Sequence, residues 1–185
     1  MSDRNPIETV YNGYRFRSRL EARWAVFFDA LGVRYDYERE GFDLGEHGWY
    51  LPDFWLPREE CWVEIKPEGF FYDPKYEAFA GTEQTLLHVV GRPWPGRYGM
   101  VLYDGLDPEH TIWGSDPMDP LVFALDRKIP GVLWVTSESA SRSLTKARID
   151  HDKPPLSDSP PLEAAYAAAS QARFEHGENP KGVGR

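Results

Sequence analysis

The stretch Tyr50–Lys66 constrains the fold more than any other part of the chain. Apolar and polar side chains alternate along its two ends, and residues 57–60 between them, Pro-Arg-Glu-Glu, have the composition of a turn. The stretch therefore predicts a β-hairpin with a four-residue loop. In such a hairpin Leu56 pairs with Cys61, and that pairing fixes the register of every other residue in the two strands.

This register places two carboxylates against each other. Counting back and forward from the loop, Asp53 lies opposite Glu64, and the period of two puts Glu64 and Lys66 on the face that Asp53 shares. Like charges directly opposite each other destabilise a sheet, and a divalent cation would offset the repulsion. Taken singly, Asp53 after a proline is also typical of a turn, and Glu64 with Lys66 is also typical of a solvated strand face.

A helix is predicted between Ser18 and Gly32. Ser18 has the position of an N-cap, Gly32 that of a C-cap, and the apolar residues between them recur at helical spacing. Glu21 borders the apolar stripe, so its carboxylate can face the sheet and join Asp53 and Glu64. The alternative is a capping box with Ser18, in which Glu21 has a structural role only.

Composition limits the classes of protein that fit. With 185 residues the chain is long enough for one compact domain with a tail, and its single cysteine, Cys61, excludes an intrachain disulfide and a cysteine-rich zinc site. The five histidines show no ligand spacing. No apolar run approaches ~18 residues, so we expect a cytoplasmic protein of a bacterial or phage-infected cell, without a membrane segment.

Charge is distributed unevenly. The formal net charge of -9 argues against a protein that coats nucleic acid non-specifically. Four arginines nevertheless crowd near the N-terminus and form a candidate nucleic-acid contact, with a solvated helix edge as the alternative: Arg15, Arg17, Arg19 and Arg23.

The rest of the chain reads as short elements. Strands are predicted over 33–37, 86–90, 100–103, 111–113 and 132–136, with helices over 75–81 and 120–127 and a turn-rich connection over 41–48. These elements define a domain over 1–136, followed by a linker over 137–161, a helix over 162–176 and a flexible tail over 177–185. The run 86–90 has the apolar character of a buried strand that can pair in parallel.

The order of acidic residues resembles one known superfamily. Glu21 on a helix, then Pro52-Asp53, then Glu64-Ile65-Lys66, is similar to the pattern of the PD-(D/E)xK nucleases over about the first half of the chain. The resemblance extends to small phage and bacterial members, including resolvase-like and transposase-like endonucleases. It implies an α/β (α+β) fold of restriction-endonuclease type, in which helices flank a mixed central sheet.

The resemblance also implies a role for each matched residue. Asp53, Glu64 and the Ile65 carbonyl would bind Mg²⁺ or Mn²⁺, Glu21 would complete the acidic set, and Lys66 would act on the attacking water. The expected function is then metal-dependent hydrolysis of phosphodiester bonds in DNA, with RNA as another candidate substrate.

Two alternatives from other classes stay open. One is a non-catalytic nuclease-fold adaptor that binds nucleic acid or protein. The other is a subunit of a recombination, transposition or defence assembly, in which the helix Leu162–His176 binds a partner or a second copy of the chain.

Overall fold

A computed structural model describes most of the chain in separate ranges: residues 6–69, 73–95, 99–103, 105, 112–113, 122–125, 133–136, 141–143 and 159–174. The N-terminal elements are β1 (Thr9–Tyr11), β2 (Tyr14–Phe16), α1 (Arg19–Leu31), β3 (Asp36–Tyr37), β4 (Phe42–Asp43), the 3-10 helix η1 (Gly45–His47) and β5 (Trp49–Tyr50). The following elements are β6 (Phe54–Leu56), β7 (Cys61–Lys66), α2 (Pro74–Ala80), β8 (Leu86–Val90), β9 (Gly99–Tyr103) and β10 (Ile112–Trp113). The C-terminal elements are β11 (Val122–Leu125), β12 (Leu133–Thr136), β13 (Ser141–Ser143) and α3 (Pro160–Gln171).

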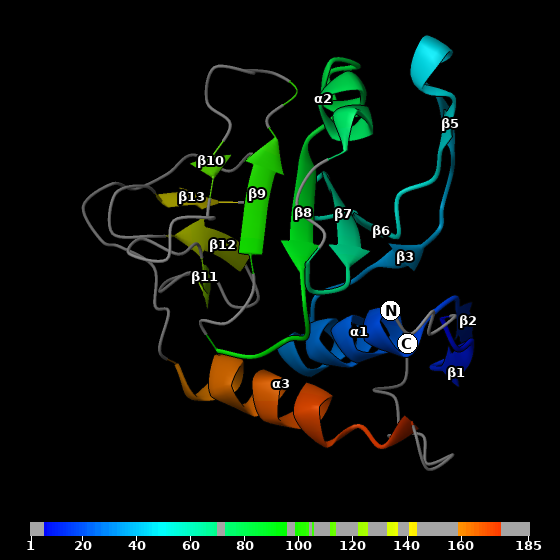
Figure 1. The fold of residues 1–185 in the computed structure, drawn as a ribbon. Helices are drawn as coiled ribbons and strands as arrows, with labels where there is room; N and C mark the ends of the chain where they lie inside the picture. The colour runs from blue at the N-terminus through cyan, green and yellow to red at the C-terminus, as the bar shows by residue number, and fades with distance from the viewer. Residues whose placement is uncertain are drawn as a thin grey trace.

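A mixed central sheet organises the molecule (Figure 1). Its strands have the order β10-β9-β8-β7-β6-β3, with β7 and β8 parallel and the other neighbours antiparallel. Helices cover this sheet, so the protein has a mixed α+β fold. The predicted parallel pairing of the run 86–90 is confirmed.

The central hairpin has the predicted register. Leu56 pairs with Cys61 and Phe54 with Val63, so the next step along the ladder brings Asp53 beside Glu64. The four-residue loop sets this register. The side-chain pattern supports it, because a slip of one residue would move the apolar side chains of β7 to the opposite face.

Helix α1 begins and ends at the predicted caps. The Ser18 hydroxyl accepts a hydrogen bond from the Glu21 N–H, and Gly32 closes the helix in the left-handed conformation at φ 70°. Before the helix, Asn12 and Gly13 make the tight turn between β1 and β2, both with positive φ.

The two faces of the central sheet bury different side chains. One face packs against α1, which presents Trp24, Phe27 and Phe28 to the apolar residues of β6 to β9. The opposite face packs against α2, where Tyr76 and Phe79 cover Trp62. Because alternate residues of β7 point to opposite faces, Glu64 and Lys66 lie on the α2 face.

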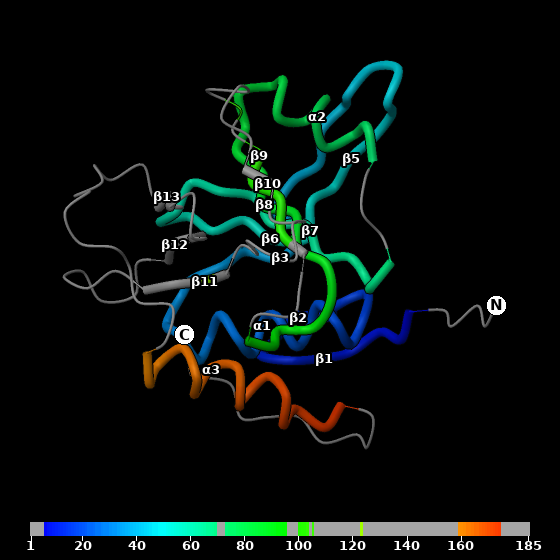
Figure 2. The backbone as a smooth tube through the Cα atoms, turned by 60° about the vertical axis from the view of Figure 1, so that its left-hand side comes forward, coloured from blue at the N-terminus to red at the C-terminus, as the bar shows by residue number. Residues whose placement is uncertain are grey.

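Helix α3 is part of the main core. It lies along α1 (Figures 1 and 2), and its Leu162, Ala165, Tyr166 and Ala169 are buried. The predicted helix over 162–176 starts earlier, at Pro160, and ends earlier, at Gln171. Because the apolar face of α3 is buried in the main core, it no longer supports the prediction of a partner or dimer interface on that face.

Three other predictions differ from the structure. The predicted helix over 120–127 is wrong, because Val122–Leu125 is strand β11, paired with β12. The predicted linker over 137–161 contains strand β13. Strand β3 covers only the end of the predicted run 33–37. The predicted tail over 177–185 lies outside the described residues.

Among the described residues, no helix is both long and apolar enough to cross a lipid bilayer.

Candidate functional site

The hairpin brings Asp53, Glu64 and Lys66 together at the end of β7. Lys66 Nζ forms an ion pair with Glu64 Oε1, which confirms that these two side chains share a face. The other carboxylate oxygen of Glu64 accepts a hydrogen bond of 3.1 Å from the Tyr50 hydroxyl. Asp53 Oδ2 accepts a hydrogen bond of 2.7 Å from the Ile65 N–H, so this carboxylate is fixed to the neighbouring strand.

Both acids are removed from water. The exposed fraction is 2% for Asp53 and 3% for Glu64. Burial raises the pKa of Asp53 well above its usual value, and the charges of Glu64 and Glu21 raise it further. Burial also raises the pKa of Glu64, although the Lys66 ammonium opposes that effect. Two neighbouring buried carboxylates ionise together more readily when a cation lies beside them.

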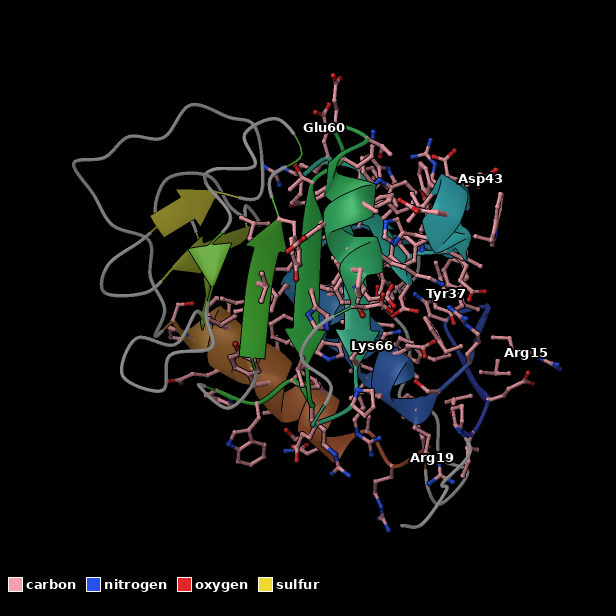
Figure 3. The ribbon with its side chains drawn as sticks, turned by 45° about the horizontal axis from the view of Figure 1, so that its top comes forward. Arg15, Arg19, Tyr37, Asp43, Glu60 and Lys66 are labelled. Carbon is pink, nitrogen blue, oxygen red and sulfur yellow. The ribbon has the colours of Figure 1, made fainter. Side chains whose placement is uncertain are left out.

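Lys66 is the amine of the site. It is half-buried, and Figure 3 shows it at the end of β7, close to the beginning of α1. Burial acts to lower the pKa of Lys66, but the charges of Glu64 and Asp53 outweigh burial and raise it. Lys66 is therefore a cation at neutral pH.

Arg17 reaches the site from the segment before α1. Its guanidinium lies 3.2 Å from Asp53 Oδ1 and also forms an ion pair with Glu38. The side chain is 54% exposed, so its other side faces solvent. Arg17 thus combines a contact to the buried acid with access to a ligand outside.

Glu21 has the contacts of the capping alternative. Its Oε1 accepts from the Ser18 hydroxyl at 2.6 Å, while Oε2 accepts from the Tyr37 hydroxyl at 2.5 Å and from the Arg17 N–H at 3.1 Å. Both oxygens are engaged in holding the start of α1. Glu21 influences Asp53 through its charge, and its hydrogen bonds position the backbone of Arg17.

The other three arginines lie in different surroundings. Arg15 is exposed and pairs with Glu8, and Arg19 is half-buried; both lie at the outer edge of the molecule in Figure 3. Arg23 corrects the expectation that all four arginines form a nucleic-acid contact. It is buried and donates a hydrogen bond of 3.0 Å to the Ala172 carbonyl, which ties α1 to the end of α3.

An aromatic and imidazole cluster surrounds Glu64, and the sequence did not single it out. His88 on β8 lies beside Glu64 in the register of the parallel strands β7 and β8. The centroid of its ring lies 4.6 Å from that of the Tyr76 ring. Burial and the Lys66 charge lower the pKa of His88 to about 4, so its imidazole is neutral at pH 7. Burial, then the Glu64 charge, raises the pKa of Tyr76, while Tyr50 donates to Glu64.

A signal for part of this cluster exists in the sequence. The runs 62–66 and 86–90 each end at a turn segment, and aligning them in parallel sets His88 against Glu64. Tyr50 has no such signal, because β5 pairs with β4 in a separate two-stranded sheet.

The metal-ligating potential of the site resides in Asp53 and Glu64. Within the described ranges, no three His, Cys, Asp or Glu side chains form a group that could hold a metal ion, and Glu21 is turned toward its own helix start. Two carboxylates with adjacent backbone oxygen match the ligand preference of Mg²⁺ or Mn²⁺, which keep several waters. The Ile65 carbonyl faces the same neighbour as its N–H, since both point to one side in an antiparallel ladder.

Comparison of the chain with protein-family models, with curated proteins and with solved structures finds no match.

Proposed function

We propose that the protein is a metal-dependent DNA endonuclease of restriction-endonuclease-like fold. The observation that carries the proposal is the placement of two buried carboxylates, Asp53 and Glu64, beside the ammonium of Lys66. Burying charged groups costs free energy, and clusters of this kind with perturbed pKa values are typical of functional sites.

Asp53 and Glu64 would hold the ion, with the Ile65 carbonyl as a further ligand. A bound Mg²⁺ or Mn²⁺ supplies a water of lowered pKa and a polarised phosphodiester. Tyr50 keeps Glu64 oriented through its hydrogen bond, and the Ile65 N–H does the same for Asp53. These contacts preorganise the two acids.

Lys66 and Arg17 would act on the substrate. The Lys66 ammonium orients the attacking water and stabilises negative charge as the water oxygen bonds to phosphorus and one P–O ester bond breaks. Arg17 can leave Asp53 for a phosphate oxygen, because more than half of its side chain is exposed. The proton of the water ends on solvent or on the departing oxygen.

A cleavage assay tests the proposal. Supercoiled plasmid, linear duplex, single-stranded DNA, four-way junction and matched RNA are each incubated with Mg²⁺, Mn²⁺ or chelator. We expect cutting of at least one DNA substrate with metal only, and a loss of at least about 100-fold in Asp53→Asn, Glu64→Gln and Lys66→Met.

The matched control is Glu60→Gln. Glu60 is an exposed glutamate in the loop of the same hairpin, at the opposite end of β7 from Lys66 (Figure 3). This variant should cut like the unmodified protein. Undiminished cutting by Glu64→Gln, or cutting in chelator, would refute the mechanism.

A specific observation favours one alternative. Arg17 pairs with Asp53 and Lys66 pairs with Glu64, so each acid already has a cationic partner within the chain. A nuclease-fold adaptor without catalysis would have such pairs. The adaptor would be supported if the protein binds DNA but cuts none of the substrates, and if Mn²⁺ leaves its DNA affinity unchanged.

A further inference from the structure

The segment Gly91–Pro95 follows β8 at the end of the sheet where Lys66 lies. Strands β7 and β8 are parallel, so their carboxyl ends meet at one edge, and Lys66 pairs with Val90 there. The Gly91 N–H donates a hydrogen bond of 2.8 Å to the Lys66 carbonyl. The segment therefore begins in direct contact with a residue of the candidate site.

The segment is fixed at its start. The Gly91 carbonyl accepts a hydrogen bond of 3.0 Å from Trp24 Nε1 of α1. Gly91 has φ 96°, a conformation that strongly favours glycine, and Pro93 is buried. Contacts to the sheet and to α1 thus hold the backbone from which the next side chains project.

Arg92 and Trp94 are presented to solvent. The chain bends at Pro93, and Arg92 and Trp94 lie directly before and after this bend. Both side chains are exposed while Pro93 between them is buried, and half of the Trp94 surface is accessible. A cation and a flat indole are therefore exposed two residues apart in the chain.

We propose that Gly91–Pro95 binds nucleic acid, with Trp94 stacked on an unpaired base and Arg92 in contact with the neighbouring backbone phosphate. Stacking on an indole is open to any base that is not already in a duplex, and arginine recognises phosphate. Three residues span at most about 10 Å, so Trp94 lies within about that distance of Gly91. This inference rests on the proposed function for the position of the scissile phosphate near Lys66.

The proposal defines the substrate class. A base can stack on Trp94 only if it is unpaired, as in a single strand, a flap, a bulge or the centre of a junction. The preferred substrate of the site would then carry an unpaired base close to the bond that is cut. A fully paired duplex would keep the phosphate contact and lose the stacking contact.

Binding measured without catalysis tests the inference. Fluorescence anisotropy of a labelled oligonucleotide in chelator gives the affinity for a single strand and for the blunt duplex of the same sequence. We expect Trp94→Ala to weaken single-strand binding about 5- to 100-fold with little change for the duplex. Arg92→Ala should weaken both and reduce the salt dependence of binding.

Trp49→Ala is the matched control. Trp49 is also an exposed tryptophan, with 66% of its surface accessible, but it lies on β5 in the small sheet with β4. This variant should bind both oligonucleotides as the unmodified protein does. Because both tryptophans are exposed, replacing either should leave the protein folded. Thermal unfolding of each variant checks this.

The outcomes separate this inference from the proposed nuclease activity. An unchanged single-strand affinity in Trp94→Ala, an equal loss on the duplex, an equal loss in Trp49→Ala, or no single-strand binding by the unmodified protein would each overturn the stacking proposal. Trp94-dependent binding without metal-dependent cutting would uphold it and refute the nuclease. Metal-dependent cutting with a single-strand affinity that Trp94→Ala leaves unchanged would refute the stacking proposal and uphold the nuclease.

Discussion

The two faces of the central sheet are built in opposite ways. The α1 face is a continuous apolar layer in which Phe54 contacts the rings of Phe16, Phe28, Tyr35 and Tyr37. The α2 face also buries aromatic rings, but it places Glu64 and His88 among them. One strand, β7, supplies both faces through its alternating residues.

The contrast separates stability from chemistry. On the α1 face the buried aromatic and aliphatic side chains gain free energy by leaving water. On the α2 face burial disfavours the charges of Glu64 and Asp53, as their raised pKa values show. We infer that the α1 face holds the fold together while the α2 face retains groups that cost stability, a pattern typical of a functional site.

The largest effect is expected from the apolar face. Phe54→Ala removes a fully buried ring from the centre of the aromatic layer and should lower the free energy of unfolding by about 3–5 kcal/mol, measured by urea denaturation. Val10→Ala, at a half-exposed position of β1, should change it by less than about 0.5 kcal/mol. Equal effects at the two positions would contradict the assignment of the core to this face.

A second effect is expected from pH on the polar face. The pKa of His88 falls from 6.5 in the unfolded chain to about 4 in the folded protein, so its contribution to stability is present above pH 6.5 and is lost as the pH falls toward 4. Between pH 7.5 and 4.5 the unmodified protein should lose about 2.5 kcal/mol more stability than His88→Gln does. Parallel pH profiles for the two proteins would show that His88 is not buried as a neutral imidazole.

A smaller effect of opposite sign is expected at Asp53. Its raised pKa means that the ionised carboxylate opposes folding, so Asp53→Asn should stabilise the metal-free protein by about 1 kcal/mol at pH 8. The gain should shrink as the pH falls below the folded pKa, where the unmodified carboxyl becomes protonated, and vanish near the unfolded value of 3.8. Asp43→Asn, at an exposed position of β4, should have no measurable effect, and destabilisation by Asp53→Asn at pH 8 would refute the cost assigned to this acid.

The sequence predicted those parts of the fold that depend on residues close together in the chain. The central hairpin register and the caps of α1 follow from loop length, side-chain alternation and capping residues, and the structure has them as predicted. The short run 122–125 could not be assigned in this way, because a few apolar residues fit a helix or a strand. Its pairing with β12 and the packing of Phe123 on Trp24 decide for the strand.

The candidate site was predictable in part for the same reason. Alternation along β7 was enough to place Glu64 with Lys66 on one face. Glu21 satisfied two patterns at once, a capping residue and a metal ligand, and only its side-chain contacts show it holding the helix start. No local sequence pattern predicted the role of Tyr50, because its contact with Glu64 joins two separate sheets.

Binding of Mn²⁺ tests most directly whether the polar face of the sheet is a cation site. Isothermal titration calorimetry at pH 8 should give a saturable isotherm that is lost in Asp53→Asn and in Glu64→Gln, and retained in Glu60→Gln and in Glu21→Gln. Affinity should weaken as the pH falls, because protons compete for the same two carboxylates. Absence of binding by the unmodified protein, or binding that survives in Asp53→Asn and Glu64→Gln, would contradict the central claim.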